Sequence, residues 1–236
     1  MASAAREMGV SVPVVHRYVS NIEAAAGEPV TKSTPMGTAL TDRGKEICRL
    51  FTQSNARCRS GRRYSVCCSP VTSDLVTSVF SQMGMTEAEL VISDDEHNIA
   101  AMIEGETDMA VIDDPLHVYE MDEYGFESDE IGNLSMVFVD NGDSFIRYKY
   151  GAQRVAFMYL DSIKRTYTVD AETYSLSELL GSNKSFFVDE LMLMKKGLRI
   201  KSGADPKVLR HVVTAVYDGS DRTALRMIDM LKKRMK

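Results

Sequence analysis

The sequence predicts an α/β protein in which a small, mainly helical N-terminal part precedes a larger domain of alternating strands and helices. Three observations support this prediction. Apolar residues recur at helical spacing near the N-terminus, strand and helix patterns alternate from residue 64 onward, and charge is divided unevenly between the two parts. A chain of 236 residues can form two domains. We therefore assign residues 1–47 to a head, residues 48–63 to a linker helix with a basic hinge, and residues 64–236 to a body.

Net charge differs in sign between the two ends of the chain. Residues 1–63 hold ten Lys and Arg against five Asp and Glu, a net charge of +5, whereas residues 64–236 have a net charge of −11. A basic end on an acidic body is expected where that end meets a polyanion such as nucleic acid. Ordinary scatter in the charge of small domains is an alternative explanation.

Composition excludes several other classes of protein. No apolar run approaches the roughly 18 residues that a membrane span needs, and the N-terminus shows no secretory pattern, so we expect a cytoplasmic protein. The four cysteines form no CxxC pair and the four histidines are scattered. We therefore predict reduced thiols, no metal and no cofactor.

The head begins with two predicted helices. Residues 3–8 favour a first helix, and Gly9 follows where a left-handed residue ends it. Ser11 is suited to cap a second helix, with Pro13 in its first turn. The stripe expected to be buried is Val15, Val19, Ile22 and Ala26. The opposite face carries His16, Arg17, Ser20 and Asn21, an arrangement that suits a helix in the DNA major groove.

A predicted wing follows the second helix. Residues 29–40 form two short β-prone pieces around Pro35-Met36-Gly37. Thr41 then caps another helix that extends to about Cys58, and a basic exit from Arg57 to Arg63 ends the linker. The order of elements is that of a winged helix-turn-helix.

The residues of this head resemble LysR-type transcriptional regulators. The shared run comprises Ser3-Ala4-Ala5-Arg6, Gly9-Val10-Ser11, Pro13, Val15, Arg17, Ile22-Glu23, Gly27, Pro29, Thr34-Pro35, Gly37 and Leu40-Thr41-Asp42-Arg43-Gly44. The related molybdate-responsive regulators share the wing. The resemblance implies double-stranded DNA as a partner and a homodimer paired through the linker helix. It also implies one more helix before residue 3, which we expect to be missing from the head.

The residues predicted to contact DNA lie on the second helix and the wing. They are Ser11, Val12, Pro13, His16, Arg17, Ser20, Lys32 and Thr34. Val12 stands where the family has an amide side chain, so base preference should differ from that of the family. Ordinary solvated surface residues are the alternative interpretation.

The body alternates strands and helices. Strands are predicted at 63–69, 90–93 and 108–112, with helices at 73–83 and 98–104 that end at Gly84 and Gly105. This order indicates a parallel, doubly wound sheet. The layout, and the run "EGETDMAVIDDP" in particular, resembles LysR effector domains and other type 2 periplasmic-binding folds, which implies a two-lobed body.

We assign residues 116 to about 200 to the second lobe. Asn141-Gly142 predicts a β-hairpin between residues 134–140 and 144–149. A strand is expected at 186–188, a helix or strand at 191–195, a helix from Asp205-Pro206, and an amphipathic helix at 222–236. The C-terminal helices are expected to complete the first lobe.

Candidate ligand-binding residues follow the strands. Ser69, Thr72 and Ser73 come after the first strand, residues 94–97 after the second, and Gln153 and Arg154 lie in the second lobe. Together they predict a small, anionic molecule bound between the lobes. Alternatively, the hydroxyls cap a helix and Arg154 forms a structural ion pair with the acidic body.

Motifs for catalysis are missing from the sequence, so we do not expect an enzyme. The function predicted is a DNA-binding regulator with a small-molecule effector. Two alternatives are a cytoplasmic binding module without DNA binding and an enzyme on a periplasmic-binding-like fold.

Overall fold

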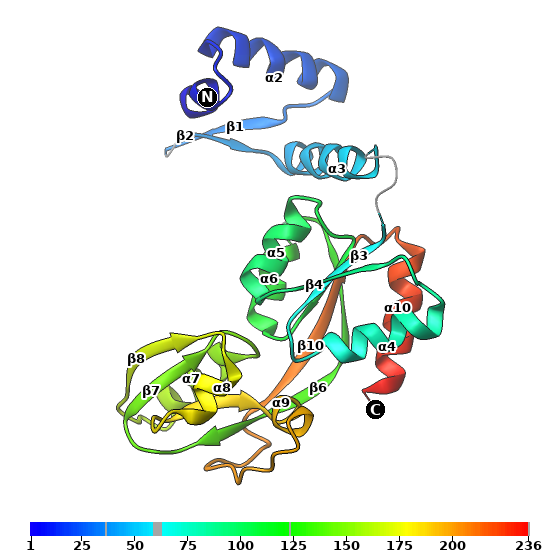
Figure 1. Cartoon of the computed structure of the whole chain (residues 1–236). Helices are drawn as coiled ribbons and strands as arrows, with labels where there is room; N and C mark the ends of the chain where they lie inside the picture. Colours follow the sequence, from blue (N-terminus) through cyan, green and yellow to red (C-terminus); the bar gives the residue numbers. More distant parts are fainter. Residues whose placement is uncertain (36, 59–62, 123, 236) are drawn as a thin grey trace. The chain divides into compact units, whose positions relative to one another are not determined.

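The computed structural model in Figure 1 describes residues 1–35, 37–58, 63–122 and 124–235, with the backbone alone for 52–58, 120 and 122. The chain forms two compact units, residues 1–60 and 61–236. Part of the predicted basic hinge, including Arg59 and Arg62, lies outside the described residues. None of the helices in the described ranges combines the length and apolar character needed to cross a membrane.

The first unit contains three helices and one hairpin in the predicted order. They are α1 (Ala2–Glu7), α2 (Val12–Ala26), β1 (Thr31–Thr34), β2 (Gly37–Leu40) and α3 (Asp42–Cys58). Gly9, in the turn between α1 and α2, has φ of +65°, a conformation that glycine adopts without a steric penalty. β1 and β2 pair antiparallel from Thr31 opposite Leu40. The hydroxyl of Thr41 accepts a hydrogen bond from the Gly44 amide at 3.1 Å, which confirms the predicted cap of α3.

Two details of α2 differ from the prediction. Ser11 occupies the N-cap position, but among the described residues its side chain accepts no helix amide, and its carbonyl oxygen takes the Val15 amide instead. Val15 is buried as predicted, whereas Ile22 keeps 43% of its surface exposed. Tyr18, four residues earlier on the same side of the helix, is also exposed. The buried stripe of α2 is therefore narrower than its apolar spacing suggested.

The first lobe of the body contains three parallel strands with helices on both faces. It contains β3 (Ser65–Cys68), α4 (Ser73–Met83), β4 (Glu89–Ile92), α5 (Asp95–Ile103), β5 (Met109–Ile112), a 3-10 turn (Pro115–His117) and α6 (Val118–Asp122). The strand order β4-β3-β5 and the parallel pairing confirm the predicted doubly wound arrangement. Val66 and Cys68 pack with α4 and α10, whereas Cys67, between them, packs with α5 on the other face.

Two long antiparallel strands join the lobes. β6 (Glu127–Val139) pairs with β10 (Arg210–Tyr217), and β10 also pairs with β5, so the six-stranded sheet has the order β4-β3-β5-β10-β6-β9. The helix predicted from Asp205 was wrong. Asp205 instead closes a turn by accepting the Lys207 amide at 2.9 Å, and the β-branched run that follows becomes β10. The last helix is α10 (Arg222–Arg234), which packs against α4 in the first lobe.

The second lobe begins where β6 leaves β10. It contains β7 (Ser144–Tyr148), α7 (Gln153–Ser162), β8 (Thr168–Thr173), α8 (Leu176–Gly181), β9 (Phe186–Asp189) and α9 (Glu190–Lys195). β6 pairs with β10 up to Ser135 and with β9 from Met136 onward. The lobe boundary therefore lies near Met136, about twenty residues later than predicted, because Met121, Phe126 and Ile131 pack within the first lobe.

The Asn141-Gly142 turn does not form the predicted hairpin. Within the described residues β6 and β7 are not paired, because β9 and the residue before it lie between them. Val139 of β6 pairs with Phe186, while Phe145 of β7 forms a parallel bridge with Ser185. Ser185 also ties the turn down. Its hydroxyl accepts the Asn141 amide at 2.7 Å and donates to the Gly142 carbonyl at 2.6 Å.

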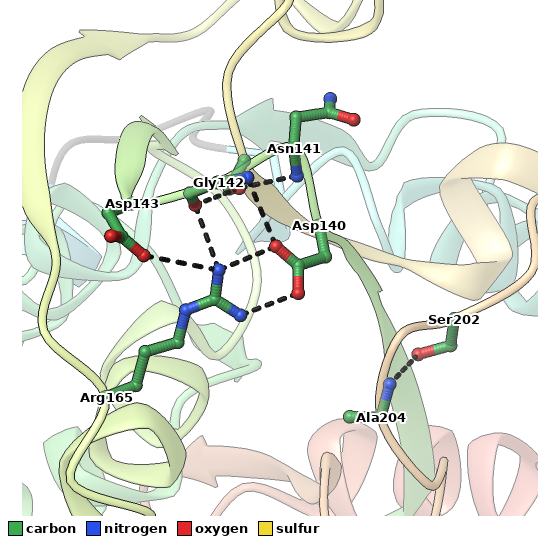
Figure 2. A network of polar contacts seen from close by, with 8 residues as sticks. Asp140, Asn141, Gly142, Asp143, Arg165, Ser202 and Ala204 are labelled. Carbon is green, nitrogen blue, oxygen red and sulfur yellow. Dashed lines mark hydrogen bonds and ion pairs between the residues drawn. The ribbon is translucent and has the colours of Figure 1, made fainter.

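Arg165 holds the same turn from outside, as Figure 2 shows. Its guanidinium donates two hydrogen bonds of 2.6 Å to the two carboxylate oxygens of Asp140 and one of 3.1 Å to the Gly142 carbonyl. It also lies over the Phe138 ring at 5.3 Å. The hydrogen bonds from Arg165 lower the pKa of Asp140, although partial burial opposes this effect.

Replacing Arg165 with Ala should destabilise the second lobe by about 1 kcal/mol, because a two-pronged pair and a cation–π contact are lost. Thermal unfolding of the full chain at pH 7 should show a lower midpoint. The difference should shrink as the pH falls below about 4, because Asp140, whose pKa is depressed by folding, then loses its charge in wild type. The matched control is Arg226→Ala, an exposed arginine on α10. Equal unfolding midpoints for wild type and Arg165→Ala would show that the contacts of Arg165 do not stabilise the second lobe.

Candidate functional site

A pocket of about 370 Å³ lies between the two lobes of the body. The first lobe contributes Asp94, Asp95, Glu96, Asp114, Leu116 and His117. The second lobe contributes Arg147, Tyr148, Lys149, Gly151, Gln153, Arg154, Phe157, Met158 and Asp161. The volume is near the lower end of the range that small-molecule sites occupy. We call this cavity the interlobe pocket.

The wall from the first lobe is built on the start of α5 and the end of β5. Asp94 caps α5 by accepting the His97 amide at 3.0 Å. One carboxylate oxygen of Asp95 accepts the amides of Asp113 and Asp114 at 3.0 and 2.8 Å, which fixes the chain where it leaves β5. The other oxygen, Oδ1, is buried and has no hydrogen-bond partner among the described residues. Burial and the neighbouring Asp113 raise the pKa of Asp95 well above its usual range.

The wall from the second lobe is built on the end of β7 and the start of α7. Gln153 donates through Nε2 to the carbonyls of Tyr150 and Phe187 at 3.1 and 3.2 Å. Its Oε1 is buried and accepts nothing from the described part of the chain. The Arg147 guanidinium lies 4.5 Å from the centre of the Phe157 ring and pairs with Glu172 at 3.5 Å.

Three polar contacts connect the lobes around the pocket. Nε of Arg154 donates to Oδ2 of Asp114 at 2.8 Å, and the Tyr174 hydroxyl donates to Oδ2 of Asp94 at 3.0 Å. Lys195 donates to the Pro70 carbonyl at 2.7 Å and pairs with a carboxylate of the first lobe. Of these side chains, Asp94, Asp114 and Arg154 also line the pocket, so a ligand there can contact them.

The predicted ligand residues separate into two groups. Gln153 and Arg154 line the pocket, and Arg154 forms the ion pair with the acidic body that was the alternative interpretation. Ser69, Thr72 and Ser73 are not part of the pocket wall that the described residues form. Ser69 donates to the Asp113 carboxylate and Ser73 donates to the Pro70 carbonyl. Thr72 occupies the N-cap position of α4, but its buried hydroxyl finds no hydrogen-bond partner in the ranges described.

Sequence reasoning missed a buried polar cluster at the junction of the lobes. Nε2 of His211 on β10 lies 3.6 Å from Oδ1 of Asp189 at the end of β9, and both side chains are almost fully buried. Burial raises the pKa of Asp189 well above its usual range and lowers that of His211 to about 4. Both shifts oppose the charged forms of the two side chains. No spacing signal marks it, because the two residues lie on different strands that are brought together by their pairing with β6.

The residues predicted to contact DNA remain accessible in the first unit. Ser11, Val12, Pro13, His16, Arg17 and Ser20 are exposed along the first turns of α2. On β1, Lys32 is exposed and Thr34 is half-buried, and the Thr34 hydroxyl donates to the Gly37 carbonyl at 2.8 Å, which closes the hairpin. Neither Arg17 nor Lys32 forms an ion pair with another described residue.

Comparisons with solved structures identify proteins of the same fold. ArgP from Mycobacterium tuberculosis matches with a TM-score of 0.60 at 13% identity, over 99% of this chain and 91% of that one. The full-length LysR-type regulator LysG from Corynebacterium glutamicum, with bound effector Arg, matches with a TM-score of 0.51 at 14% identity over 98% and 91%. The regulatory domain of OxyR2 from Vibrio vulnificus matches with a TM-score of 0.54 at 12% identity over 72% and 94%.

The chain has the fold of LysR-type regulators. The resemblance stated from the sequence is thereby confirmed at the level of fold. No family model matches the sequence, and neither does a curated protein. Similarity at 12–14% sequence identity shows a common fold and does not indicate which ligand this chain binds.

The Asp94–His97 contact at the pocket rim predicts a shifted histidine. Nδ1 of His97 lies 2.7 Å from the Asp94 carboxylate, and this hydrogen bond raises the pKa of His97 above its usual value of 6.5. Titration of the full chain by NMR should give a His97 pKa that returns towards 6.5 in Asp94→Asn. The stabilisation from this pair should be complete below pH 6.5 and lost as the pH rises through the pKa of the folded state. Tyr174→Phe is the control, because it retains the carboxylate. An unshifted His97 in wild type would contradict the contact.

Proposed function

We propose that the chain is a DNA-binding transcriptional regulator of LysR type. Residues 1–47 form a winged helix-turn-helix that binds double-stranded DNA, residues 48–63 form the linker, and residues 64–236 bind a small effector between two lobes. The observation that supports the proposal best is α2. It follows a glycine turn after α1, precedes a two-stranded hairpin, and presents an exposed polar face.

The exposed face of α2 has the chemistry that DNA recognition needs. Arg17 supplies a cation for phosphate or for the acceptor edge of guanine, and His16 and Ser20 supply further hydrogen-bonding groups. Val12 is 37% exposed at the start of the helix, where its methyl groups suit the methyl group of thymine. Lys32 and Thr34 on the hairpin are placed to contact phosphates beside the groove.

The interlobe pocket is the proposed effector site. Gln153 and Arg154 line it from the second lobe, and their carboxylate counterparts line it from the first. The effector found in LysG supports the general role of such a ligand in this fold. A ligand that prefers one arrangement of the lobes would change the activity of the DNA-binding part, because coupling between two sites requires such a preference.

Exposed apolar residues on α3 support a homodimer. Leu50 and Phe51 keep 47% and 66% of their surfaces exposed. Apolar side chains of this size are suited to bury against a second copy of the helix, which would pair two heads on a two-fold symmetric operator. The proposed dimer therefore uses α3.

Replacing Arg17 with Ala should weaken binding of the full chain to double-stranded DNA. Loss of one phosphate contact should also lower the slope of log affinity against log salt concentration by about 1. Fluorescence anisotropy with labelled DNA at several salt concentrations measures both quantities. Arg226→Ala removes an exposed charge from α10 and should leave both unchanged. Wild-type affinity in Arg17→Ala would exclude α2 as the reading helix. Ligand binding without any DNA binding by wild type would favour the binding module.

Replacing Phe51 with Asp should shift the full chain from dimer to monomer, because it places a charge in the proposed α3 contact. Light scattering after size-exclusion chromatography reports the mass directly. Asp42→Asn on the same helix is the control for a change of charge alone. A dimer of unchanged stability in Phe51→Asp would show that α3 is not the seam.

A further inference from the structure

The two walls of the interlobe pocket carry opposite charge. The first lobe presents the carboxyl groups of Asp94, Asp95, Glu96 and Asp114. The second lobe presents Arg147, Lys149 and Arg154, with Asp161 as its acid in the wall. A simple anion in this pocket would meet four carboxyl groups, and a simple cation would meet three basic side chains.

Buried acceptors on the wall lack donors. Oδ1 of Asp95 and Oε1 of Gln153 are both buried, and no described residue donates a hydrogen bond to either. Gln153 is only 7% exposed, and its amide nitrogen is fixed by two carbonyls, so its oxygen cannot be exchanged for a donor by turning the amide. Buried polar atoms in folded proteins are nearly always satisfied. Cationic donors on a ligand would satisfy these acceptors and would favour the ionised form of Asp95, which burial opposes in the free protein.

Donors are also available on the opposite wall. Asp114 engages Nε of Arg154, which leaves the two terminal nitrogens of that guanidinium to other partners, and 43% of the side chain is exposed. Arg147 donates through one terminal nitrogen to Glu172 at 3.5 Å, whereas its buried Nε has no hydrogen-bond partner in the described ranges. Terminal guanidinium nitrogens bind carboxylates in a two-pronged geometry.

We infer that the interlobe pocket binds a small zwitterion of the α-amino acid class. Its ammonium group lies towards Asp95, Glu96 and Oε1 of Gln153, and its carboxylate lies towards Arg147 and Arg154. This inference rests on the proposed effector site and deepens it, because it replaces the simple anion expected from the sequence with a molecule that carries both charges.

The test uses the full chain and defined probes. The twenty standard L-amino acids are screened by thermal shift, and each one that binds is compared by calorimetry with two analogues. One analogue lacks the α-amino group and the other lacks the carboxylate. At least one amino acid should bind, and both of its analogues should bind at least about 30-fold more weakly, because each leaves one charged wall without its counterpart.

Pocket variants identify the ammonium site. Glu96→Gln should weaken binding of the amino acid about threefold, as expected for an exposed charge, and Asp95→Asn should weaken it more. Glu104→Gln, an exposed glutamate at the other end of α5, is the matched control and should bind as wild type does. Because Glu96 is exposed, its variant should fold even if Asp95→Asn does not.

Two results would overturn the inference. They are equal binding by the analogue without the amino group, and no binding by any of the twenty amino acids. Neither result bears on DNA binding by the same preparation, which is measured separately by anisotropy. Loss of the zwitterion site can therefore be distinguished from failure of the proposed regulator.

Discussion

The pairing of β6 with β10 is the constraint on which both lobes depend. β10 lies between β5 and β6, and β6 continues beyond β10 to pair with β9. Two strands therefore carry one sheet from the first lobe into the second. A bulge between Val213 and Thr214 adjusts the register along this pairing. Each wall of the interlobe pocket is attached to this common pair, so relative movement of the walls must bend or twist β6 and β10.

This arrangement explains why the polar groups gather at the junction. β5 ends at Ile112 and β9 ends at Asp189. The segments that follow these two strands leave the sheet close to where β6 changes partner. Asp95 fixes the exit from β5, while Gln153 ties α7 to the β9 strand through the Phe187 carbonyl. The buried Asp189–His211 pair joins β9 to β10 at the same junction. Polar residues here connect elements from both lobes. Two of them, Asp95 and Gln153, also line the pocket and have acceptor atoms without a hydrogen-bond partner among the described residues.

Local signals in the sequence predicted local structure well. Gly84 has φ of +66° and ends α4 as predicted, and the Thr41 cap, the α1–α2 turn and the order of β3, β4 and β5 were also predicted. The errors in strand pairing concern contacts between distant residues. The Asn141-Gly142 signal is local, but the strand inserted beside it comes from residues 186–189. Likewise, the β-branched run after Asp205 signals a strand, but its central place between β5 and β6 depends on pairing with residues far away in the sequence.

The candidate site shows the same division. Gln153 and Arg154 were predicted from their hydrogen-bonding groups beside a glycine, and both line the pocket. Ser69, Thr72 and Ser73 follow the correct strand, but burial directs Ser69 and Ser73 to partners inside the protein. Tyr174 and Lys195, which connect the lobes, lie 80 and 125 residues from their partners. Spacing along the chain therefore predicts which residues have suitable chemistry, and tertiary contacts decide which of them face a ligand.

The proposed DNA recognition by α2 is tested by selecting binding sites for the full chain from a pool of random double-stranded DNA. We expect enrichment of a sequence with two half-sites related by two-fold symmetry, because two copies of α2 would read the same bases from opposite sides. We also expect the enriched sequence to bind more tightly than a scrambled control at the same salt concentration. Failure to enrich any sequence, or equal binding of the enriched and scrambled DNA, would show that the chain does not recognise a DNA sequence.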